Sequence, residues 1–108
     1  MTVQTLTDSN LFYLAAPGKP ERVLSKVFCC DLLSIAMGKA PSDSVWVTVM
    51  GNKNTLAVAS LADVACVILA EGVTFSKEEL DCAREEGIAV YTTNEPVFEA
   101  ALKVHQLL

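Results

Sequence analysis

The chain has 108 residues, the size of one domain; 52% are hydrophobic and only 6% are aromatic. Its 13 acidic and 8 basic residues give a net charge of −5 with no basic cluster, which argues against nucleic-acid binding. No apolar segment reaches the roughly 20 residues that a membrane-spanning helix needs, so we expect no membrane contact. We therefore predict a single cytoplasmic domain over residues 1–108.

The first thirty residues carry the weakest structural signals in the chain. Residues 1–11 are polar and show no clear period, and we expect them to lie on the surface. Phe12–Ala15 and Val23–Cys29 are short strand candidates, and the proline- and glycine-rich segment 17–20 between them predicts a turn. This part is expected to add a hairpin or an irregular edge to the fold.

A short helix and a clear strand are predicted next. Asp31 is placed to cap a helix over Leu32–Met37, and Gly38 is placed to end it. Ser44–Val49 is rich in β-branched and aromatic residues, which favours a strand. After a polar break, Thr55–Leu61 is predicted to form a helix rich in small residues.

Two further strands follow, with a helix between them. Ala65–Ala70 is a continuous apolar run, as expected for an interior parallel strand. A capping box at Ser76–Glu79 predicts a helix that runs to Glu86 and ends at Gly87. Ile88–Tyr91 then forms the next strand without a spacer.

The last helix is predicted to be amphipathic. Thr93 or Asn94 is expected to cap it, with Pro96 in its first turn. Its apolar stripe consists of Val97, Ala101, Val104 and Leu108. Strands that alternate with helices through short connections predict right-handed βαβ units. We therefore predict a three-layer α/β/α domain with a mostly parallel central sheet.

Ligands of open parallel sheets bind at the carboxyl ends of the strands, where the next helices begin. Gly51–Asn54 is the strongest candidate loop, because Gly51 permits close backbone approach, the helix N-terminus presents free amides and Lys53 adds a cation. Such a group suits a phosphate or carboxylate, although Gly and Asn also form ordinary loops, and it lacks the P-loop spacing. The predicted ligand-binding residues are Gly51, Asn52, Lys53, Asn54, Glu71, Gly72, Thr92, Thr93 and Asn94.

No set of residues suited to catalysis or metal binding is recognisable. The single histidine, His105, lies near the end of the last helix, far from the strand-end loops, so no activated nucleophile is expected. The four cysteines have no metal-ligand spacing; Cys66 is expected in the core, and adjacent Cys29 and Cys30 are expected on opposite faces. We therefore predict no enzyme activity, no metal and no cofactor, in a reducing compartment.

Several short segments share the pattern of a known family. They are Cys30–Ser34 with Met37-Gly38, Val45–Thr48, Asn54–Ala59, Asp63–Ile68 and the Glu-Glu-Gly-Ile junction Glu85–Ile88. On these segments, residues 27–108 resemble the DRTGG domain, which is related to the N-terminal domain of HPr kinase/phosphorylase and occurs in phosphotransacetylases and beside CBS domains. Short free-standing DRTGG proteins are similar over nearly the whole length. The resemblance implies the α/β fold of that N-terminal domain and a regulatory or accessory role.

The sequence departs from the family at the residues that give it its name. Asn52-Lys53, or residues beside them, stand in place of Asp-Arg, and Ala70-Glu71-Gly72 stands in place of Thr-Gly-Gly. A cation is thus retained and a glycine is lost. The kinase chemistry of HPr kinase resides in a separate P-loop domain, which this sequence lacks, so the resemblance implies no kinase activity.

Three functional hypotheses result. The first is a non-catalytic regulatory domain that senses a small anionic ligand or a nucleotide and self-associates as a homo-oligomer, such as a dimer. The second is a protein-interaction module whose apolar helix faces dock a partner protein or another copy, with small residues such as Ala57 and Ala59 allowing close approach. The third is a thiol-dependent redox protein that uses Cys29 or Cys30.

Overall fold

A computed structural model describes all residues, 1–108, and contains five strands and five helices. The strands are β1 (Tyr13–Pro17), β2 (Val27–Cys29), β3 (Val45–Thr48), β4 (Cys66–Leu69) and β5 (Ala89–Thr92). The helices are α1 (Val3–Asp8), α2 (Leu33–Lys39), α3 (Lys53–Leu61), α4 (Lys77–Glu86) and α5 (Val97–Leu107). The strands form one sheet in the order β1-β5-β4-β3-β2, in which only β1 is antiparallel to its neighbour. The predicted mostly parallel sheet is confirmed.

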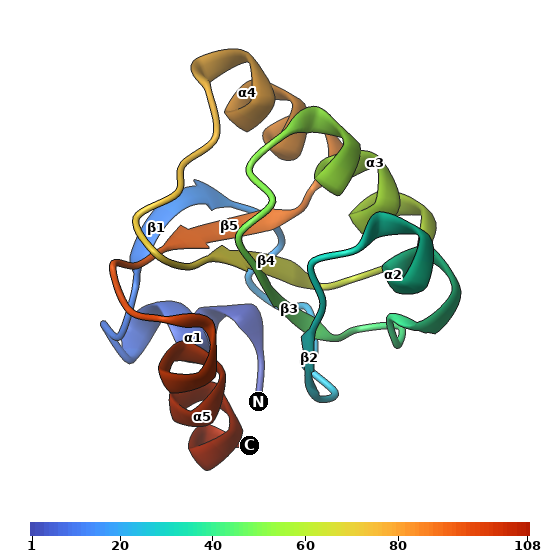
Figure 1. Cartoon of the computed structure of the whole chain (residues 1–108). Helices are drawn as coiled ribbons and strands as arrows, with labels where there is room; N and C mark the ends of the chain where they lie inside the picture. The colour runs from blue at the N-terminus through green and yellow to red at the C-terminus, as the bar shows by residue number, and fades with distance from the viewer.

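Helices cover both faces of the sheet. Figure 1 shows α1 and α5 on one side and α2, α3 and α4 on the other. Successive residues of a strand point to opposite faces, so β3 supplies both cores: Val45 and Val47 pack with α1 and α5, whereas Trp46 packs with α3 and α4. The predicted three-layer α/β/α architecture is confirmed, and burial on both faces explains the continuous apolar strands.

The predicted start and end of α4 are also confirmed. At the start of α4, the Glu79 amide donates to Ser76 Oγ at 3.2 Å and the Ser76 amide donates to Glu79 Oε1 at 2.8 Å. Gly87 ends α4 in the left-handed region, with φ of 70°. None of the five helices is both long enough and apolar enough to cross a bilayer.

Most of residues 1–11 lie on the surface, as predicted, but the helix that they form was not predicted. They contain α1, which begins at a capping box between Thr2 and Thr5 and buries Val3 and Leu6 in the core beside α5. Only two side chains of this one-and-a-half-turn helix are buried. Two buried positions are too few to produce a recognisable helical period in the sequence.

The first two strands form no hairpin. β1 lies beside β5 at one edge of the sheet and β2 lies beside β3 at the other, as Figure 1 shows. The predicted irregular edge is therefore correct, and the hairpin is wrong. β2 is also shorter than the predicted strand Val23–Cys29, because the segment before Val27 instead passes α1, with a single bridge between Thr2 and Val23.

Asp31 does not cap α2 as predicted. Leu32 precedes the helix and provides no side-chain cap. The Asp31 carboxylate instead crosses to the neighbouring strand, where Oδ1 accepts hydrogen bonds from Thr48 Oγ1 at 2.7 Å and from the Val49 amide at 2.9 Å. The two longer-range bonds compete with local capping for the same oxygen, and sequence spacing does not reveal them.

Two other helix ends differ by a few residues from the predicted ones. Gly38 lies inside α2, which extends to Lys39. Pro96 precedes α5 as its N-cap residue and not as part of the first turn. Thr93 instead accepts a hydrogen bond from the Glu95 amide at 3.2 Å, which stabilises the turn ahead of the helix.

Candidate functional site

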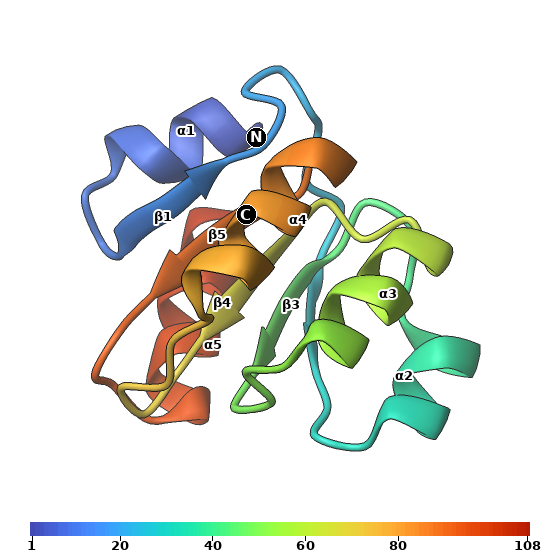
Figure 2. The same ribbon diagram turned by 90° about the horizontal axis from the view of Figure 1, so that it is seen from above.

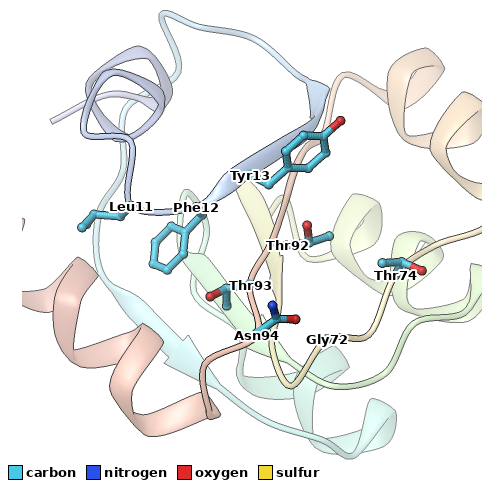
Figure 3. Close-up of a pocket in the computed structure, with 8 residues that line it drawn as sticks. All are labelled: Leu11, Phe12, Tyr13, Gly72, Thr74, Thr92, Thr93 and Asn94. Atoms are coloured by element: carbon cyan, nitrogen blue, oxygen red, sulfur yellow. The ribbon is translucent and has the colours of Figure 1, made fainter.

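A pocket of about 300 Å³, here called the strand-end pocket, opens at the carboxyl edge of the sheet. Figure 3 shows its lining residues, which are Leu11, Phe12, Tyr13, Gly72, Thr74, Thr92, Thr93 and Asn94. β1 runs antiparallel to β5, so the start of β1 lies at the end of β5, with Tyr13 paired with Thr92. Aromatic residues from the first strand therefore meet the polar loops that follow β4 and β5.

Four of the predicted residues, Gly72 and Thr92–Asn94, line this pocket, and Glu71 adjoins it. Backbone hydrogen bonds join the two loops that carry them. The Gly72 amide donates to the Thr93 carbonyl and the Glu71 amide donates to the Glu95 carbonyl, both at 2.9 Å. The predicted meeting of these two loops is thus observed, and their backbone bonds fix the rim of the pocket.

Two glycines allow the loops to pack closely. Gly72 has φ of +75°, and a Cβ there would lie 3.2 Å from Asn94 Oδ1. A Cβ at Gly51 would lie 2.5 Å from Val73 Cγ1 and 3.0 Å from the Thr74 carbonyl oxygen. The close backbone approach expected at Gly51 therefore occurs within the chain, against the loop that carries the pocket residue Thr74.

The remaining predicted residues lie elsewhere. Asn52 Oδ1 accepts hydrogen bonds from the amides of Asn54 at 2.9 Å and Thr55 at 3.3 Å, so these expected free amides already have a partner. Lys53 and Asn54 line a separate hollow of about 380 Å³ between α3 and α4. The structure thus divides the predicted residues between two regions, and it separates the cation Lys53 from the strand-end pocket.

Sequence reasoning missed the aromatic wall of the pocket. Phe12 packs edge-on against Tyr91, with ring centroids 6.4 Å apart and an interplanar angle of 61°. The Tyr91 hydroxyl is hydrogen-bonded to Thr7 Oγ1 at 2.8 Å and to the Val3 carbonyl at 3.1 Å, and burial raises its pKa to about 12. The sequence indicates only that Phe12 belongs to a strand. Nothing in it indicates which other strand the segment Phe12–Ala15 pairs with.

The structure places the other chemically interesting residues away from the pocket. His105 is exposed in the last turn of α5, and no group of three metal-ligating side chains comes together. Cys66 is buried, as predicted, which raises the pKa of its thiol. Partial desolvation and the nearby Asp31 carboxylate raise the pKa of the exposed Cys29. Both thiols are therefore held in the less reactive neutral form at neutral pH.

Comparison with known proteins identifies the fold. No protein-family model and no curated protein sequence matches the chain. A solved structure of the CBS and DRTGG domains of the regulatory region of Clostridium perfringens pyrophosphatase matches 99% of it, with a TM-score of 0.75 and 18% identity. The chain has a DRTGG-like fold. It spans about half (47%) of the matched structure, which was determined in complex with an activator, diadenosine tetraphosphate.

Proposed function

We propose that this chain is a non-catalytic regulatory domain that binds a nucleotide or nucleoside in the strand-end pocket. The observation that carries the proposal is the composition of that pocket. Phe12 and Tyr13, at the start of β1, supply two aromatic rings that point in different directions, and hydroxyl and amide groups of the loops after β4 and β5 complete the lining. This combination suits a flat heterocyclic base, which stacks on aromatic rings and exchanges hydrogen bonds through its edge.

The volume of the pocket limits the size of the bound group. About 300 Å³ is at the lower end of the range for small-molecule pockets. It accommodates one base, or a base with part of its sugar, but not a whole dinucleotide. The ring therefore enters the pocket while the rest of the ligand lies at its mouth.

The charge of the lining refines the predicted anionic ligand. No Lys, Arg or His lines the strand-end pocket. A phosphate inside it would lose hydration without gaining an opposite charge, which is costly. The structure therefore favours recognition of the neutral base over recognition of the phosphate.

The DRTGG-like fold supports a regulatory role, because the similar pyrophosphatase structure belongs to a regulatory region and contains a nucleotide activator. For this chain we further propose one domain over residues 1–108, a cytoplasmic location consistent with its four free cysteines, and self-association as a dimer. Enzyme activity is not part of the proposal, since the pocket contains no nucleophile paired with a base.

Calorimetric titration with adenosine, guanosine, their monophosphates and inorganic phosphate tests this function. We expect a nucleoside and its monophosphate to bind with similar affinity and inorganic phosphate not to bind. Asn94→Ala removes an amide from the lining and is expected to weaken binding by about tenfold, the usual effect of one lost hydrogen bond. Thr92→Val, which replaces a hydroxyl by a methyl, is expected to act in the same direction.

Lys53→Ala serves as the matched control, because Lys53 lies at the same edge but outside the pocket. It should leave nucleoside affinity unchanged. If no nucleoside or nucleotide binds, the proposed function is wrong. Loss of binding in Lys53→Ala with no loss in Asn94→Ala would place the site at the start of α3 instead.

A further inference from the structure

We propose that a second copy of this chain docks on the outer face of the α2–α3–α4 layer, in a two-fold symmetric contact centred on Ala57. The inference rests on the self-association proposed above and adds the surface, the relative direction of the two copies and the ion pair that fixes it. It is independent of ligand binding in the strand-end pocket.

Helix α3 forms the middle of this face. Figure 2 shows α3 between α2 and α4, with its outer side uncovered. An apolar hollow lies on each side of it, about 510 Å³ against α2 and about 380 Å³ against α4, and both are lined by Asn54 and Ala57. Exposed Asn54 and Ala57 lie between the hollows, and the small side chain of Ala57 lets a helix from another molecule approach the middle of α3 closely.

Large apolar side chains are exposed beside Ala57. Leu61, at the end of α3, is 73% exposed, and Met37 of α2 is 50% exposed. Both also line the hollows, Leu61 on the α4 side and Met37 on the α2 side. Adjacent exposed apolar groups of this kind mark an interaction surface rather than an ordinary solvated face.

Charge determines how two such faces fit together. Lys53 starts α3, four residues before Ala57, and Leu61 ends it, four residues after. Glu86 of α4 lies at the Leu61 end, since its carboxylate accepts a hydrogen bond from Ser60 Oγ at 3.1 Å. Neither Lys53 nor Glu86 forms an ion pair within the chain.

An antiparallel crossing of α3 with α3 of a second copy is therefore self-complementary. It places Lys53 of each copy over the Leu61 end of the other, next to Glu86, and forms the same ion pair twice. Leu61 of each copy lies over the hollow between α3 and α4 of the other copy, at the end of that hollow where Lys53 lies. A parallel crossing would place Lys53 beside Lys53, which is repulsive. Two-fold symmetry of this type is the commonest in homo-oligomers.

Charge reversal measured by sedimentation velocity tests the contact. We expect the wild-type chain to dimerise without ligand, and Lys53→Glu or Glu86→Lys to weaken dimerisation by about tenfold or more, because each creates two like-charge contacts. The double variant Lys53→Glu/Glu86→Lys should restore the wild-type dissociation constant. Both reversals suit the helix ends on which they lie, an acid at the start of α3 and a base at the end of α4, so the fold is retained.

Two matched controls carry the same changes of charge outside the hollows. Lys77→Glu changes the first residue of α4, and Glu85→Lys changes the residue beside Glu86; neither should affect dimerisation. Leu61→Ser should weaken it because it removes apolar contact. A wild-type chain that stays monomeric at millimolar concentration, or a double variant that does not recover, would overturn the inference. Dimerisation is measured without any ligand, so a chain that does not dimerise is distinguishable from one that does not bind nucleosides.

Discussion

The strand-end pocket and the α3 face differ in what forms them. The pocket rim is held by backbone hydrogen bonds and by close contacts at glycines, and its lining is largely polar. The α3 face depends on exposed side chains, above all Leu61, and its hollows are largely apolar. A rim fixed by backbone suits a small ligand that needs exact placement of a few polar groups, whereas an apolar face gains affinity from the area that a second protein covers. Substitutions at the glycines should therefore separate the two regions.

Gly18→Ala is expected to have the largest effect, and on the pocket side. Gly18 has φ of +58°, and a Cβ there would lie 2.4 Å from the Ala89 amide nitrogen at the start of β5. Backbone atoms cannot move aside without shifting β1 along β5, so we expect the free energy of unfolding to fall by about 3 kcal/mol. Urea denaturation measures this loss. Since β1 begins at Tyr13, directly after Phe12, nucleoside binding should also weaken in the molecules that remain folded.

Gly38→Ala is the control for this substitution. Gly38 lies within α2, and a Cβ there meets no atom within 4 Å. Alanine in a helix interior is more stable than glycine, so the free energy of unfolding should rise by about 0.5 kcal/mol. If Gly18→Ala and Gly38→Ala lowered the free energy of unfolding by the same amount, the contact between Gly18 and Ala89 would not be what holds β1 in place.

Gly51→Ala tests whether the two regions are independent. It would bring a methyl group against Val73 Cγ1 and the Thr74 carbonyl, in the loop that lines the strand-end pocket. We expect about 1 kcal/mol loss of stability by denaturation and about threefold weaker nucleoside binding by calorimetry, with unchanged dimerisation. Adding Val73→Ala should recover most of both losses, because it removes the closer of the two contacts. A change in dimerisation would contradict the separation of the regions.

The parts of the molecule that were predicted from sequence have local causes. The capping box at Ser76–Glu79 and the glycine stop at Gly87 act within a few residues, and the buried strands β3 and β4 are continuous apolar runs. The rule that strand ends meet at one edge of a parallel sheet also located Gly72 and Thr92–Asn94, which line one pocket.

The parts that were missed depend on contacts between distant segments. Phe12 lines the pocket only because β1 pairs antiparallel with β5, more than seventy residues later. Asp31 bonds to the end of β3 rather than to its own helix. Lys53 lies after β3, at the expected edge of the sheet, but its side chain lines the hollow between α3 and α4. Local patterns indicate the ends of elements; they do not indicate the order of the strands or the direction of a side chain.

The smallest expected effect is at Glu71, at the rim of the strand-end pocket. Glu71 has φ of +58°, a left-handed conformation that glycine adopts freely and that costs other residues about 1 kcal/mol. Glu71→Gly relieves this cost but adds freedom to the unfolded chain, so we expect a net gain of about 0.5 kcal/mol in the free energy of unfolding.

Glu71→Ala is the matched control: it also removes the charge, but it keeps the strain and should give no gain. Because the Glu71 amide still bonds to the Glu95 carbonyl in both variants, the rim should persist and nucleoside affinity should stay the same. An equal gain in both variants, measured by urea denaturation, would mean that the carboxylate and not the backbone is the source of the cost.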